Sequence, residues 1–158
     1  GEMVGTVSFE NTTYAPLPLK YEAGTQNFAA VATYVPAIQI FNQLSEQEVE
    51  KEYEVVKEYI YNALSNDARI RIYGVPCGTL QEKTALFSFT VDGVHHEDLA
   101  LILDKMGVAV RSGQMCAEPL VDRFGVKGML RVSFAPYNTM QDAEYFIKSL
   151  NKAIAMLQ

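Results

Sequence analysis

The stretch that organises this chain runs from residue 108 to residue 119 and reads Val-Ala-Val-Arg-Ser-Gly-Gln-Met-Cys-Ala-Glu-Pro. Its apolar start predicts a short strand, Val108–Val110. Side chains alternate between the two faces of a strand, so Ala109 and Arg111 point away from the valines. The residues 117–119 then predict the start of a helix. The cysteine between these elements is therefore expected on a loop.

A second strand is predicted over residues 130–135, with arginine at its second position. Its apolar face consists of Leu130, Val132 and Phe134. If the two strands are neighbours, Arg111 and Arg131 share the opposite face, where an arginine fork can bind a carboxylate or phosphate with two hydrogen bonds. The plainer interpretation is an exposed sheet face that happens to carry two arginines, and the residues alone favour it.

Cys116 is open to two interpretations that the residues alone do not separate. A single cysteine in a soluble protein is often a small buried apolar residue. Against this, Gly113 gives the loop conformational freedom, and the positive end of the helix that follows favours a thiolate. A structural and a reactive thiol are therefore equally open at this point.

Composition limits the classes of function. The chain has 158 residues, 49% of them hydrophobic, which suits one globular domain with a core. Its net charge of −6 argues against binding nucleic acid. No apolar run is long enough for a membrane span, and no signal peptide opens the sequence. Cys77 and Cys116 are its two cysteines, too few for a disulfide framework, so a reducing cytoplasm is the expected location.

The remaining patterns predict an α+β protein with a mixed or antiparallel sheet and helices on one face. Apolar residues at helical spacing predict a helix over 28–41 that Pro36 kinks, and the Ser45–Glu48 capping box opens a second one. Strands are predicted over 69–73 and 85–91, and Cys77 lies in the turn between them. Helices start at His95 and after Thr139, whereas residues 12–19 read as irregular.

Two further clusters resemble binding motifs. Gly24 and Thr25 precede the first helix, where backbone amides can bind an anion, although an ordinary helix cap explains them equally simply. His95 and His96 stand beside Glu97 and Asp98. Adjacent histidines point in different directions, so we expect a solvated helix start and no metal site.

The motif Arg-Ser-Gly-x-x-Cys-Ala-x-Pro-Leu from residue 111, followed by Asp-Arg-Phe-Gly at 122–125 and Arg-Val-Ser-Phe-Ala-x-Tyr-Asn-Thr at 131–139, resembles the C-terminal part of cysteine desulfurases that use pyridoxal phosphate. The resemblance is to the sulfur-mobilisation type, which is similar to selenocysteine lyases and belongs to the class V aminotransferases. It covers nearly the whole chain. It implies the small C-terminal domain of a fold-type I enzyme (residues 41–158), with residues 1–40 at the seam with a missing large domain.

The resemblance also implies an activity and roles for residues. L-cysteine is converted to L-alanine while Cys116 takes up the sulfur as a persulfide, for a sulfur-acceptor protein and iron-sulfur cluster assembly. Pyridoxal phosphate acts as the electron sink. Arg131 matches the arginine that holds the substrate carboxylate, and Arg111 one that helps to place the substrate and the loop. Gly24 and Thr25 match a turn that contacts the cofactor phosphate bound in the other subunit of a homodimer.

This sequence departs from the family pattern at three places. Gln26 replaces a proline, and Gln114-Met115 replaces the His-His that commonly precedes the cysteine. The lysine that binds the cofactor lies upstream of Gly1 in the family, so the chain alone is expected to be inactive. Two alternatives stay open: a selenocysteine lyase or other class V enzyme, and a sulfur-carrier or interaction domain without catalysis.

Overall fold

A computed structural model describes residues 2–44, 47–74, 80 and 83–158 of the chain. The chain divides into two compact units, Gly1–Gln43 and Leu44–Gln158. The sequence-based boundary lies at residue 40. Within the described residues, no helix is both long enough and apolar enough to cross a membrane.

The first unit begins with a β-hairpin in which β1 (Val4–Val7) pairs antiparallel with β2 (Thr12–Tyr14). The short 3-10 helix η1 (Leu19–Tyr21) follows, and then α1 (Phe28–Ala32) and α2 (Tyr34–Leu44). The expectation of irregular structure from residue 12 onwards was wrong for β2. Threonine and tyrosine favour strands, and the partner strand β1 satisfies their backbone groups.

The helix predicted over 28–41 is divided in two, but not at the proline. The break falls at Thr33, and Pro36 lies in the first turn of α2, where a missing backbone N–H is tolerated. A continuous helix would bring the Pro36 ring against the carbonyl of Ala32. The interruption one residue after Ala32 removes this clash, which explains why the break precedes the proline.

None of the described residues up to Gln43 is buried. The apolar stripe of the helix predicted over 28–41 is exposed, including Phe28 at 66% and Phe41 at 67% of their maximal accessible surface. Phe9 at the hairpin tip is fully exposed. The first unit therefore has no hydrophobic core of its own.

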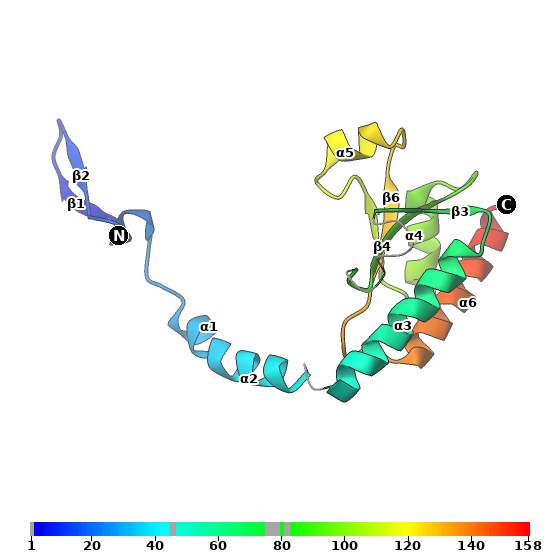
Figure 1. Cartoon of the computed structure of the whole chain (residues 1–158). Helices are drawn as coiled ribbons and strands as arrows, with labels where there is room; N and C mark the ends of the chain where they lie inside the picture. Colours follow the sequence, from blue (N-terminus) through cyan, green and yellow to red (C-terminus); the bar gives the residue numbers. More distant parts are fainter. Residues whose placement is uncertain (1, 45–46, 75–79, 81–82) are drawn as a thin grey trace. The chain divides into compact units, whose positions relative to one another are not determined.

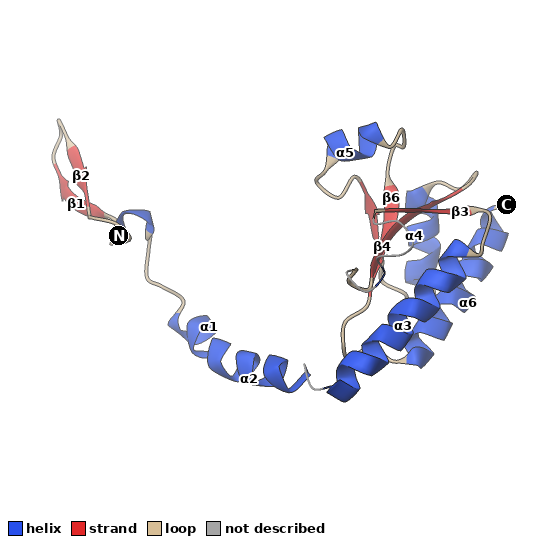
Figure 2. Ribbon diagram, viewed as in Figure 1, coloured by secondary structure: helices blue, strands red, loops and turns tan. Residues whose placement is uncertain are grey.

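The second unit is an α+β layer, as the sequence predicts (Figures 1 and 2). Its elements are α3 (Gln47–Ser65), β3 (Ile70–Tyr73), β4 (Leu86–Val91), α4 (His96–Lys105), β5 (Arg111–Gly113), α5 (Glu118–Arg123), β6 (Met129–Ser133) and α6 (Met140–Leu157). The four strands form one antiparallel sheet in the order β3-β4-β6-β5. Two residues of the predicted capping box, Ser45 and Glu46, lie outside the described residues, and so does Cys77.

The core lies between one face of this sheet and the helices α3, α4 and α6. The predicted stripes on the helices and strands supply it. Its most completely buried members include Ile60, Leu64, Phe87, Phe89, Leu99, Leu103, Leu130, Leu150 and Ile154. Burying an aliphatic or aromatic side chain of this size contributes about 1.5–3 kcal/mol. A continuous apolar layer thus supports the sheet on the face that is covered by α3, α4 and α6.

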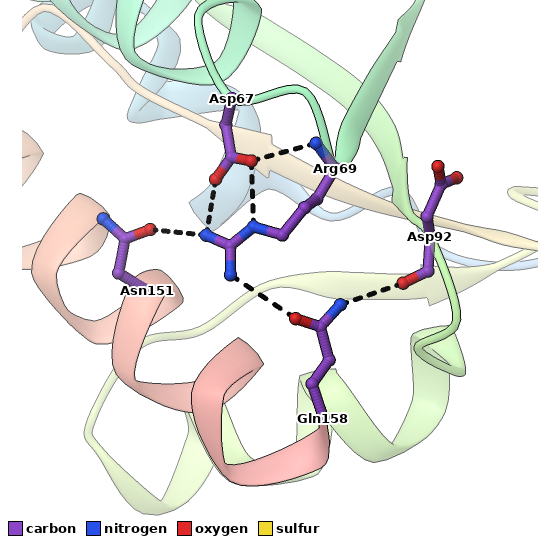
Figure 3. A network of polar contacts seen from close by, with 5 residues as sticks. All are labelled: Asp67, Arg69, Asp92, Asn151 and Gln158. Atoms are coloured by element: carbon purple, nitrogen blue, oxygen red, sulfur yellow. Dashed lines mark hydrogen bonds and ion pairs between the residues drawn. The ribbon is translucent and has the colours of Figure 1, made fainter.

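A polar network ties the end of α6 to the start of the sheet (Figure 3). Arg69 donates from Nε and Nη2 to the two carboxylate oxygens of Asp67, at 2.9 and 2.7 Å, and these hydrogen bonds lower the pKa of Asp67. Arg69 also reaches Asn151 and Gln158, and Gln158 donates to the backbone carbonyl of Asp92 at 3.1 Å. The C-terminal residue is thereby held against the turn between β4 and α4.

One strand was placed wrongly from the sequence. β5 begins at Arg111, whereas residues 108–110 form no ladder. The backbone N–H of Val108 donates to the carbonyl of Leu103 and so helps to end α4, with Gly107 in the left-handed conformation. The predicted alternation nevertheless holds, because Val108 and Val110 pack against the core.

Candidate functional site

The sheet face opposite the three long helices carries a row of side chains, one from each strand. Tyr73 pairs with Ser88, Ser88 with Arg131, and Arg131 with Arg111. Directly paired residues point to the same side of a sheet. The expectation that the two arginines share a face is therefore confirmed.

The two arginines stand directly opposite each other on neighbouring strands. Like charges in this position repel and destabilise the pair. In addition, Nε of Arg131 is buried and has no hydrogen-bond partner within the described part of the chain. A buried donor without a partner is unfavourable. Both features would be relieved by an anion with two oxygens, so the pair is suited to a carboxylate.

The short helix α5 packs on this same face. Val121 forms a small apolar cluster with Tyr73 and Met129, which Phe124 and Val126 complete. The rings of Tyr73 and Phe124 lie 5.0 Å apart between centroids. This cluster anchors α5 beside the arginines, and with it the loop that leads into the helix.

The loop between β5 and α5 has an unusual backbone. Gly113, Met115 and Cys116 all have positive φ, at 105°, 59° and 59°. The left-handed region is unfavourable for residues with a Cβ atom, and such residues concentrate at functional sites. The N–H of Ala117 donates to the carbonyl of Gln114 at 2.9 Å and closes a turn around the cysteine. The thiol of Cys116 is exposed, as a reactive cysteine requires.

Two side-chain contacts hold this turn. Nη2 of Arg111 donates to Sγ of Cys116 at 3.4 Å. Nε2 of Gln114 donates to Oε1 of Glu118 at 3.1 Å. The structure thus brings together Arg111, Arg131 and Cys116. Glu118 is an additional contact that the sequence analysis did not single out.

The other sequence-based candidates lie elsewhere. Gly24 and Thr25 belong to the first unit and form an exposed bend, and the cap of α1 is Asn27, which accepts from the N–H of Ala30. Apart from Gly24 and its two chain neighbours, no described residue has an atom within 4 Å of a Cβ placed on Gly24, so there is open space beside the bend. His95 caps α4 by accepting from the N–H of Glu97.

The described residues contain no group of three histidine, cysteine or acidic side chains placed to hold a metal. Burial lowers the pKa of Lys83, but its Nζ lies over the ring of Phe87, which belongs to the helix-covered face of the sheet. A cavity of about 550 Å³ between α3 and the start of α6 also lies outside the arginine row. Within the described part of the chain, the arginine pair and the exposed thiol therefore lie together, whereas the role of the Gly24–Thr25 bend toward a cofactor phosphate stays a prediction.

Comparison with known proteins defines the class. Residues 1–146 match the family Aminotransferase class-V, and the chain belongs to this family. It is 41% identical over 157 residues to a probable cysteine desulfurase of Vibrio cholerae, covering 99% of this chain and 38% of that protein. A cysteine desulfurase of Haloferax volcanii is 35% identical over 153 residues, covering 97% and 35%.

Solved structures agree with this classification. The crystal structure of the cysteine desulfurase CsdA (S-sulfonic acid) from Escherichia coli superimposes with a TM-score of 0.79 at 34% identity, covering all of this chain and 38% of that one. The apo cysteine desulfurase of Thermococcus onnurineus NA1 gives 0.79 at 27% identity, covering 99% and 38%. The resemblance and the fold type expected from the sequence are confirmed, and the chain spans little more than a third of these relatives.

Proposed function

We propose that this chain is the C-terminal part of a cysteine desulfurase that converts L-cysteine to L-alanine and a persulfide on Cys116. One observation carries the proposal. Arg111 contacts the sulfur of Cys116 at 3.4 Å and is paired across the sheet with Arg131, whose buried Nε has no hydrogen-bond partner among the described residues. A carboxylate held between the guanidiniums would lie beside the thiol. An amino acid that carries both a carboxylate and a sulfur atom fits this arrangement.

The two arginines bind and orient the substrate in this proposal. Their guanidiniums hold the carboxylate of L-cysteine, and binding removes the repulsion between them. Fixing the carboxylate at one end of a three-carbon substrate limits where its sulfur can lie. Orientation of this kind contributes strongly to rate because the reacting atoms no longer have to find each other.

Cys116 receives the sulfur. Its deprotonated Sγ forms a bond to the substrate sulfur while the bond between that sulfur and the substrate carbon breaks. The electron pair of the broken bond stays with the carbon, which takes up a proton and leaves as L-alanine. Pyridoxal phosphate, when bound, supplies the electron-withdrawing system that this cleavage needs. The exposed position of Cys116 allows the persulfide to pass to an acceptor protein.

The first unit has a separate role in this proposal. Its described residues include none that is buried, as expected for a segment that packs against a large domain outside this chain. Gly24 and Thr25 would contact the cofactor phosphate held by the other subunit of a homodimer. The cofactor lysine would come from the large domain, so the isolated chain should be inactive. The complete protein would act in the cytoplasm, in iron-sulfur cluster assembly.

The test uses the complete reading frame that encodes this chain, loaded with pyridoxal phosphate. Sulfide release from L-cysteine in the presence of a thiol reductant is compared between the wild type and Cys116→Ala. We expect release in the wild type and loss in the variant, with the cofactor absorbance unchanged. Selenide release that Cys116→Ala does not reduce would favour a selenocysteine lyase. If the complete frame binds no cofactor but Cys116 accepts persulfide from a donor, the carrier alternative is correct.

A further inference from the structure

The Cys116 loop holds a conformation that its own backbone disfavours. Met115 and Cys116 are consecutive residues with φ of 59°, and neither is glycine. Side chains with a Cβ atom clash with the backbone in this region, so a free loop would leave it. The conformation must therefore be maintained by contacts outside these two residues.

The hydrogen bond between Gln114 and Glu118 is placed to provide that restraint. Gln114 directly follows β5, and Glu118 is the first residue of α5. Their side chains meet at 3.1 Å and enclose the two left-handed residues. The backbone bond from Ala117 to Gln114 lies inside the same closed segment. One side-chain contact thus connects the two ends of the loop.

Both ends of this contact are attached to fixed elements. The register of β5 on β6 places the residues up to Gly113, and Val121 in the small apolar cluster anchors α5. The sheet and the helix therefore fix Gly113 and α5, while the residues between them are restrained by the contact between Gln114 and Glu118. Within that span, Cys116 has its sulfur 3.4 Å from Nη2 of Arg111. If the connection between the ends is lost, the loop can relax and this contact is no longer enforced.

We propose that Gln114 and Glu118 are positioning residues whose side-chain hydrogen bond keeps the loop in the conformation that presents Cys116 to Arg111. The catalytic consequence rests on the proposed desulfurase function. An amide that does not titrate can make the contact with Glu118 without gaining or losing a proton. In this protein the loop is thus positioned by a neutral donor.

A charge swap tests the proposal in the complete, cofactor-loaded protein. Gln114→Glu places two carboxylates against each other and should open the contact. Adding Glu118→Gln restores an amide–carboxylate pair with its direction reversed. Gln141→Glu, an exposed position in the first turn of α6, makes the same chemical change away from the loop and serves as the control.

The first readout does not depend on activity. Amide exchange of Ala117, whose N–H is bonded to Gln114, should become about fivefold faster in Gln114→Glu, the factor that one net hydrogen bond represents. The swapped double variant should return to the wild-type rate, and the control should not change. Equal exchange rates in all four proteins would overturn the proposal even if the enzyme is a desulfurase.

The second readout tests positioning for the reaction. Gln114→Glu should lower kcat for sulfide release about fivefold with KM for L-cysteine unchanged, because the arginines still bind the carboxylate. The double variant should recover kcat. If exchange responds and kcat does not, the contact holds the loop but does not position the thiol, and the proposal is wrong. Absence of desulfurase activity in the wild type would refute the proposed function, and the exchange data would still decide whether the contact holds the loop.

Discussion

Replacing Arg131 with methionine should stabilise the folded protein and at the same time remove one half of the proposed carboxylate site. The side chain of Arg131 is partly buried and stands opposite Arg111, and its Nε has no hydrogen-bond partner in the part of the chain that the structure describes. Methionine keeps an unbranched apolar stem of similar length, so the packing of that stem is largely preserved. The substitution therefore removes unfavourable terms and few favourable ones.

The expected gain in the free energy of unfolding follows from the buried Nε and the like-charged pair. A buried donor without a partner costs about 1–3 kcal/mol, and a like-charged cross-strand pair costs up to about 1 kcal/mol. Because Arg131 is only partly buried, we expect the lower end, a gain of about 1 kcal/mol in the free energy of unfolding. For a chain of 158 residues this corresponds to a rise in Tm of about 2–4 °C.

Thermal unfolding followed by circular dichroism, without added amino acid, measures this change. Arg71→Met is the matched control on the same face of the sheet. Arg71 is paired with a threonine and has its guanidinium carbon 5.1 Å from the centre of the Tyr73 ring. Loss of that cation–π contact should cost about 0.5–1 kcal/mol and lower Tm. If Arg131→Met lowers Tm as the control does, the arginine pair is not strained and the carboxylate argument fails.

Two further predictions concern the stability of the second unit. Thr139→Ala should lower the free energy of unfolding by about 1 kcal/mol, because Thr139 and Asp142 form a reciprocal capping box at the start of α6. A loss below about 0.5 kcal/mol in denaturant titration, the lower end for such caps, would contradict this. Burial, reinforced by the neighbouring charge of His95, lowers the pKa of His96 below its ordinary 6.5. Well above pH 6.5, His96 is neutral in both the folded and the unfolded state. As the pH decreases through 6.5 the unfolded state binds the proton first, so the free energy of unfolding should decrease as the pH decreases, and less steeply in His96→Asn. Equal pH slopes in the two proteins would show that His96 does not contribute.

Periodicity was enough to predict the core but not the ends of every element. The apolar residues at helical spacing on α3, which end at Leu64, are predicted to be buried, and so are Phe87 and Phe89, which alternate with polar residues on β4. The structure buries Leu64 and both phenylalanines in the core. The start of β5 depended on a backbone hydrogen bond, which the spacing of apolar residues does not encode. Val108 uses its N–H to end α4, and this hydrogen bond leaves the apolar triplet outside the ladder.

The candidate site was predictable to a similar degree. Alternation predicted that Arg111 and Arg131 share one face of the sheet, because each follows an apolar residue that points to the other face. Those apolar residues, Val110 and Leu130, are partly buried and buried in the structure. The left-handed backbone at Met115 and Cys116 had no local signal, since neither residue type favours it. The contact between Gln114 and Glu118 was also invisible, because the i,i+4 rule applies within one helix and only Glu118 belongs to α5.

The order of strands in the sheet has a consequence for synthesis on the ribosome. β6 lies between β4 and β5, although it is the last strand of the chain to be made. Until it emerges, β5 has no neighbour to bond with, and the thiol loop attached to it has no fixed support. Non-local strand pairs of this kind form late because the connecting chain must first be closed. The two arginines therefore become opposed only after β6 has emerged, and in a nascent chain that stalls before β6 the cysteine loop lacks the support of the sheet.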